Sequence, residues 1–119
     1  MGRTVFVPTA EAREVPLPHC LLRWLCQGEF SDLTGLAFGE ASFPAGGGHG
    51  PHRHPNAEEI LYVLKGRAMQ GVSDQERELG PGDVALVRRD EVHWTRSVGD
   101  EPLTLLVIFS HPKPETVDL

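Results

Sequence analysis

Apolar residues along this chain gather in short runs, and glycine, proline or aspartate separates most runs from the next. Runs of this length, rich in aliphatic and aromatic side chains and bounded by turn residues, predict β-strands. No segment keeps a helical period of apolar positions with a cap at each end, so at most one helical turn is expected, at residues 11–15. The expected strands cover residues 21–26, 33–43, 59–65, 67–72, 76–79, 83–87, 92–97 and 103–109.

The number and spacing of these strands predict an all-β fold. Short strands with a turn between each are typical of an antiparallel sandwich or barrel. The chain has 119 residues, 39% of them hydrophobic, which suits one domain with one core. We expect the barrel at residues 20–111. The proline-rich arm at 1–19 is either extended or an edge strand given to a partner, and the prolines of the tail at 112–119 exclude a central strand.

Charge and cysteine content narrow the class of protein. Eleven Lys and Arg against 17 Asp and Glu give a net charge of −6, which argues against a nucleic-acid partner or an anionic membrane surface. No apolar run is long enough to span a membrane, and the first residues lack the apolar stretch of a signal peptide. Cys20 and Cys26 are expected to be reduced thiols that pack as small apolar side chains, in a cytoplasmic protein.

Four residues between positions 52 and 93 form a candidate metal site. His52 and His54 lie two residues apart, so on a strand both imidazoles point to one face. Pro55 interrupts that strand, which allows Glu59 to begin the next strand on the same side. His93 follows a turn later in the chain. Three imidazoles and one carboxylate suit one divalent transition metal per chain, with iron, manganese, nickel and zinc as the candidates.

Other titratable residues near this constellation are assigned lesser roles. Glu58 competes with Glu59 for the carboxylate position. His49 has odd parity to His52, so it is expected to point elsewhere and to lie at the rim. His19 and His111 are expected to be ordinary surface or core residues.

With these residues in place, the sequence resembles the cupin superfamily. The first cupin motif, G-x5-H-x-H-x3,4-E-x6-G, is filled at every fixed position, by Gly46, His52, His54, Glu59 and Gly66. The resemblance implies a single-domain cupin, which is an antiparallel double-stranded β-helix (a jelly-roll barrel) with the metal inside. It also implies a homodimer whose subunits exchange the N-terminal arm.

The second cupin motif, G-x5-P-x-G-x2-H-x3-N, is kept only in part. Gly82 and His93 are present, whereas Arg88, Asp90 and Ser97 stand where the motif has proline, glycine and asparagine. These departures fall in the turn and after it, not on the histidine itself.

Cupins carry out many reactions, so the pocket must decide the function. Alternation along the strands predicts that Thr95 and Ser97 face inward with His93. On the paired strand either Met69 and Gly71 or Gln70 and Val72 face inward, and Met69 is taken as the pocket residue.

The first hypothesis is a metal-dependent enzyme on a small polar or oxygenated organic substrate. It would be either a Lewis-acid isomerase, lyase or cyclase, or an iron-type dioxygenase, with Glu59 as ligand or base. The alternative is a non-catalytic module that binds or senses a small molecule through the metal. A storage role without metal is the third hypothesis.

Overall fold

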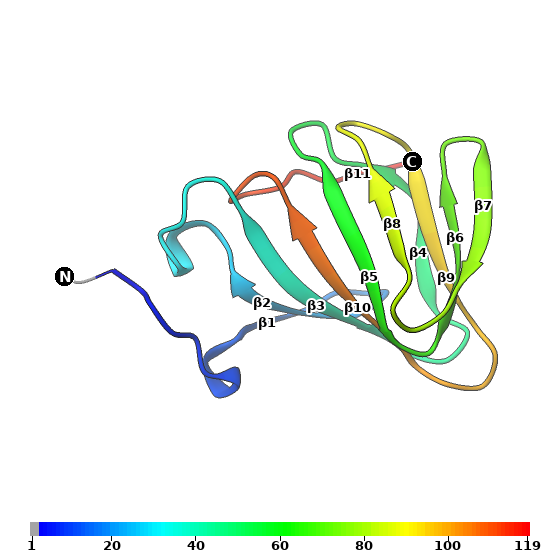
Figure 1. Cartoon of the computed structure of the whole chain (residues 1–119), viewed down its shortest axis with the longest axis horizontal. Coiled ribbons are helices and arrows are strands. Elements are labelled where there is room, and N and C mark those ends of the chain that lie inside the picture. The colour runs from blue at the N-terminus through cyan, green and yellow to red at the C-terminus, as the bar shows by residue number, and fades with distance from the viewer. Residues whose placement is uncertain (1–2) are drawn as a thin grey trace.

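The computed structural model describes residues 3–119, and over these residues the chain is built from β-strands and two single-turn 3-10 helices. Met1 and Gly2, which belong to the predicted N-terminal arm, lie outside the described residues. All strand pairs are antiparallel, and they form two sheets that face each other (Figure 1). The all-β jelly-roll class predicted from the sequence is therefore confirmed.

The two sheets draw their strands from distant parts of the chain. The six-stranded sheet has the order β1 (Arg13–Pro16), β2 (Leu21–Cys26), β3 (Ala37–Phe43), β10 (Leu103–Phe109), β5 (Glu59–Lys65), β8 (Val84–Val87). The five-stranded sheet has the order β11 (Val117–Asp118), β4 (Gly48–Arg53), β9 (His93–Val98), β6 (Arg67–Val72), β7 (Gln75–Leu79). The two 3-10 turns are η1 (Thr9–Glu11) and η2 (Gly28–Phe30).

The core lies between the sheets because the strands alternate strictly. In β3 and in β10 every second residue is buried, beginning with the first. Ala37 and Leu103 have no exposed surface, and both belong to an apolar cluster that spans the two sheets. Burial of this apolar surface is the main favourable term in folding a domain of this size.

Two turns show how the motif positions shape the backbone. Gly66 joins β5 to β6 with a φ of 83°, and a side chain there would collide with the carbonyl oxygen of Pro102. Asp90 has a φ of 63°, so this aspartate takes up a left-handed conformation at the position where the second cupin motif has glycine. Aspartate tolerates this conformation better than most residues. The loop before His93 therefore keeps a glycine-like turn despite its altered sequence.

The largest differences from the sequence-based expectation are near the N-terminus. The predicted helical turn at 11–15 is wrong: the turn is at Thr9–Glu11, and Arg13 already begins β1, which pairs with β2 of the same chain. Val15 favours a strand because it is β-branched, and Pro16 cannot continue a helix. The second strand begins at Ala37 rather than Leu33. Over the described residues, no helix is long and apolar enough to cross a membrane.

Candidate metal centre

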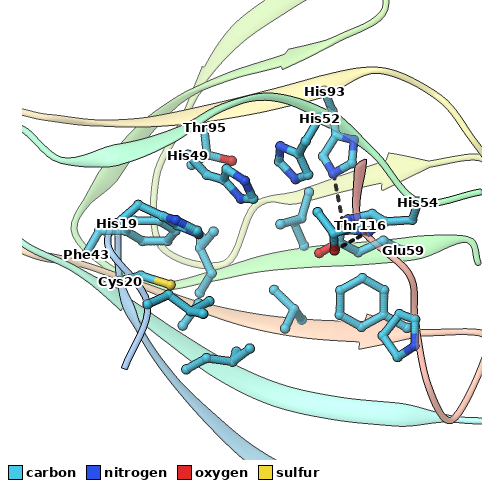
Figure 2. Close-up of a pocket in the computed structure, with 18 of the residues that line it drawn as sticks. His19, Cys20, Phe43, His49, His52, His54, Glu59, His93, Thr95 and Thr116 are labelled. Carbon is cyan, nitrogen blue, oxygen red and sulfur yellow. Dashed lines mark hydrogen bonds and ion pairs between the residues drawn. The ribbon is translucent and has the colours of Figure 1, made fainter. Parts of the chain in front are cut away.

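Strand pairing brings the predicted ligands together from both motifs. His52 on β4 is the register partner of His93 on β9, so the two imidazoles lie side by side on the inner face of the five-stranded sheet. His54 follows one residue after the end of β4, and Glu59 is the first residue of β5 in the opposite sheet. Figure 2 shows the four side chains converging. His52, His54 and His93 each present a ligand atom within 4.8 Å of the others.

This cluster is removed from solvent. His52 and His54 are each 5% exposed, His93 is 1% exposed and Glu59 is 5% exposed. Burying this many polar groups costs free energy unless each finds a partner. The partners of the imidazoles therefore decide what the cluster can hold.

Each imidazole is oriented by a backbone carbonyl on its outer side. His52 Nδ1 lies 2.7 Å from the carbonyl oxygen of Gly50, and His93 Nδ1 lies 2.9 Å from that of Glu91. His54 Nδ1 lies 2.9 Å from the carbonyl oxygen of Glu115. A carbonyl can only accept, so in all three rings Nδ1 carries the proton. In the neutral ring the lone pair is then on Nε2, which faces the centre of the cluster.

Glu59 meets two of these inward nitrogens. Its Oε1 lies 3.0 Å from His93 Nε2 and 3.1 Å from His54 Nε2. Two lone-pair nitrogens facing a carboxylate repel it unless a proton or a cation lies between them. Over residues 3–119, His54 Nε2 is also a buried side-chain polar atom with no hydrogen-bond partner. The donor set therefore fits a divalent ion, which would satisfy the three nitrogens and the carboxylate at once.

The pKa directions agree with this arrangement. Burial, followed by the neighbouring His93, lowers the pKa of His52 to about 3, so this ring stays neutral and able to donate its lone pair. Burial also lowers the pKa of His54, but the contacts with Glu59 outweigh it and the net pKa is raised. Burial raises the pKa of Glu59, yet His54 and His93 bring it below its usual range. The Glu59 carboxyl group therefore favours its negative form and the His54 imidazole favours its positive form.

The C-terminal tail takes part in the site, which the sequence did not reveal. Glu115 supplies the carbonyl that orients His54, and Thr116 Oγ1 lies 3.2 Å from the same Nδ1. Asn56 holds the tail in place, because its Nδ2 donates to the Lys113 carbonyl (3.0 Å) and its Oδ1 accepts from the Glu115 amide (2.8 Å). β11 then pairs with the edge of β4. These bonds use backbone atoms, so no side-chain pattern in residues 112–119 announces them.

The loop before His93 is fixed against the first motif. Arg53 Nη1 donates to Asp90 Oδ1 at 2.6 Å, and the Asp90 amide donates to the His54 carbonyl at 2.9 Å. The left-handed Asp90 therefore links the turn that carries His93 to the segment that carries His52 and His54.

His49 and His19 both line the cavity, although the sequence predicted that His49 points elsewhere and that His19 is an ordinary surface or core residue. The register of β4 shifts between His49 and His52, so the bulge at Gly50-Pro51 resets the parity and the two rings stack with centroids 3.6 Å apart. His19 stacks on the other face of His49 at 3.9 Å, so it lines the cavity rather than lying apart from it. His49 Nε2 is 2.7 Å from Asp118 Oδ1. Glu58 is exposed and lies outside the cluster.

The predicted pocket residues are divided between inside and outside. The cavity beside the histidines has a volume of about 260 Å³, and Thr95 lines it. The Thr95 hydroxyl donates to Gln70 Oε1 at 2.6 Å, so Gln70, not Met69, is the inward residue of β6. Met69 is half-buried and does not line the cavity, which corrects its assignment. Ser97 is buried but donates to the Glu101 carbonyl away from the cavity wall.

Cys20 also lines the cavity, and burial raises the pKa of its thiol to about 11. A thiol with so high a pKa is a poor nucleophile and a poor metal ligand at neutral pH. Cys20 therefore acts here as a small apolar side chain, and both cysteines are free thiols.

An antiparallel jelly roll with buried histidines and a carboxylate on its inner surface defines the class of small metal-binding barrels. The Cupin domain family model matches residues 39–109, which include all four predicted ligands. The chain belongs to the cupin family.

Known cupins extend this comparison. Germin-like protein 2-4 of Oryza sativa subsp. japonica is 36% identical over 89 residues, covering 70% of this chain and 39% of its own length. Oxalate oxidase GF-3.8 of Triticum aestivum is 29% identical over 95 residues, covering 73% of this chain and 42% of its own. The chain thus spans less than half the length of these curated relatives.

A solved structure shows the same fold. The formate complex of Lactobacillus farciminis oxalate decarboxylase superposes with a TM-score of 0.83 at 22% identity, over 92% of this chain and 34% of that chain.

The role of the tail in orienting His54 can be tested through Asn56. In Asn56→Ala both hydrogen bonds to residues 113 and 115 are lost, so we expect zinc or manganese affinity to fall by up to about tenfold, at the lower end of the cost of removing an outer-shell partner. Isothermal titration calorimetry measures this. Gln75→Ala, which removes an exposed amide at the start of β7, is the matched control. Unchanged affinity in Asn56→Ala would contradict the assigned role.

Proposed function

We propose that this cupin is a metal-dependent enzyme that acts on a small oxygenated organic molecule. It would hold one divalent transition metal per chain through His52, His54 and His93, with Glu59 as the fourth ligand. The observation that carries the proposal is the set of Nδ1–carbonyl hydrogen bonds, which turns three Nε2 lone pairs toward one carboxylate. The names of the oxalate oxidase and oxalate decarboxylase relatives support chemistry on small oxygenated molecules.

The ion would supply one of two kinds of chemistry when bound. Iron, manganese, nickel or zinc polarises a substrate oxygen as a Lewis acid, and iron also supports reactions with dioxygen. His52, His54, His93 and Glu59 would hold the ion, and its remaining coordination positions would be open to substrate.

The chain's own residues then have distinct tasks. The carbonyls of Gly50, Glu91 and Glu115 keep the three rings in the tautomer that a ligand needs. Glu59 either stays a ligand or accepts a proton from substrate at Oε1, the oxygen nearest the imidazoles. The apolar side chains of the cavity lower the local dielectric constant around a substrate, which strengthens polar contacts inside it.

The ligand assignment is tested by substitution. In His52→Ala and in His93→Ala we expect metal affinity to fall by at least about a hundredfold, since a ligand matters no less than an outer-shell partner. The barrel should stay folded, as judged by circular dichroism, because each substitution removes a buried polar ring rather than apolar core. The measurement is metal content by mass spectrometry after dialysis.

The control is Gln75→Ala, which removes an exposed side chain outside the cavity and should retain full occupancy. Full occupancy in His52→Ala and His93→Ala as well would refute the ligand assignment.

We also propose that the protein is a homodimer. Apolar side chains of β5 and β8 point away from the core, and Ile60 and Leu86, which are register partners, are 40% and 52% exposed. Val84 and Leu64 extend the same outer face at 46% and 39% exposure. Contiguous exposed apolar surface of this kind is typical of an interface. Exchange of the arm at 1–19 stays a prediction, since β1 pairs with β2 of its own chain.

Sedimentation velocity at micromolar concentration measures the oligomeric state. We expect a dimer, and we expect Leu86→Glu to shift it toward monomer because a buried unpaired carboxylate is costly. Arg77→Glu, on an exposed position of β7, should leave the dimer intact. A monomeric unaltered protein would contradict the proposal.

A further inference from the structure

The cavity beside the histidines has two chemically different walls. The five-stranded sheet contributes His49, His52, His93 and Thr95, which Figure 2 shows on one side of the cavity. The six-stranded sheet contributes eight apolar side chains, which are Leu22, Trp24, Ala41, Phe43, Leu61, Leu105, Val107 and Phe109. A ligand between the sheets therefore meets the polar cluster at one end and hydrocarbon at the other.

Over residues 3–119, no lysine or arginine lines this cavity. The arginines of the neighbouring strands are engaged on the outside of the barrel. Arg23 pairs with Glu14 and Glu40, and Arg53 pairs with Asp90. A second carboxylate on a ligand would thus enter an apolar wall with no lysine or arginine to receive it, which is costly.

The charges at the polar end set a similar limit. A divalent ion with three neutral imidazoles and the Glu59 carboxylate carries a net charge of about +1. The other carboxylate on the cavity, Asp118, is already engaged by His49 at 2.7 Å. The centre can therefore neutralise one negative charge on a ligand but not two.

We propose that the cavity selects a molecule with one chelating oxygen head, neutral or singly charged, on an apolar body, and that it rejects small dianions. The inference rests on the proposed metal site and goes beyond it by naming the substrate class. The volume of about 260 Å³ is just below the usual range for ligand sites, so the apolar body is small, of the size of one ring or a short branched chain. Oxalate, which appears in the names of two relatives, is a small dianion, so the proposed class of substrate differs from it.

The experiment uses zinc-loaded full-length protein and three probes that share one carboxylate head. Acetate lacks the apolar body, 4-methylbenzoate has it, and terephthalate has about the same size with a second charge at the far end. Binding is followed by calorimetry and by the change in tryptophan fluorescence, to which Trp24 contributes from the cavity wall. We expect 4-methylbenzoate to bind at least about tenfold more tightly than either acetate or terephthalate, since even one methylene in an apolar pocket can be worth tenfold.

A variant of the apolar wall separates this preference from binding to the metal alone. Leu22 is half-buried and lines the cavity, so Leu22→Ala should weaken 4-methylbenzoate about tenfold and leave acetate unchanged. Leu33→Ala, at an exposed position outside the cavity and outside the proposed dimer face, is the matched control and should change neither.

The outcomes distinguish the two levels of the proposal. Protein that takes up no zinc overturns the proposed function, and this inference with it. Protein that holds zinc but binds terephthalate or acetate as tightly as 4-methylbenzoate overturns this inference alone. The metal content is measured in the same samples, so the two failures cannot be confused.

Discussion

Three hydrogen bonds from imidazole Nδ1 atoms to backbone carbonyls govern the rest of the site. They come from three separate segments, the β4 bulge, the loop before β9 and the C-terminal tail, and each fixes one ring in the barrel interior. Because the Nδ1–H groups donate to these carbonyls, the inward Nε2 atoms present lone pairs to a buried carboxylate. Such a cluster is stable in a low-dielectric interior only if a positive charge is present, either a proton or a metal ion. The barrel is thereby organised to hold a cation.

The fold supplies this arrangement through two properties of sheets. Antiparallel pairing of β4 and β9 sets His52 beside His93, and the opposing sheet brings Glu59 across the core from β5. The same opposing sheet carries the apolar side chains that line the cavity. The polar and apolar ends therefore come from the construction of the barrel, and the six-stranded sheet contributes Glu59 as well as the apolar side chains.

The pattern of apolar residues was sufficient to predict the class of fold and most of the strands. The runs at 21–26, 59–65, 67–72 and 103–109 coincide with β2, β5, β6 and β10, and Gly66 and Pro102 directly flank the last three of these strands. Parity failed at His49 because a bulge at Gly50-Pro51 shifts the register, and this Gly-Pro pair was the signal in the sequence that could have shown it. Met69 was assigned inward instead of Gln70 for a related reason: both parities of β6 are compatible with its sequence. The tail was missed because it docks through main-chain atoms, and it lies outside residues 39–109, the part that matches the family model.

The most direct test of this account is the metal content of the protein isolated under anaerobic conditions, without a chelator and without a metal-affinity column. The account predicts close to one divalent transition metal ion per chain, bound through imidazole nitrogen. Protein that emerges without metal and also takes up none when iron, manganese, nickel or zinc is added would contradict it. In that case protons, and not a metal ion, would lie between the Glu59 carboxylate and the nitrogens of His54 and His93.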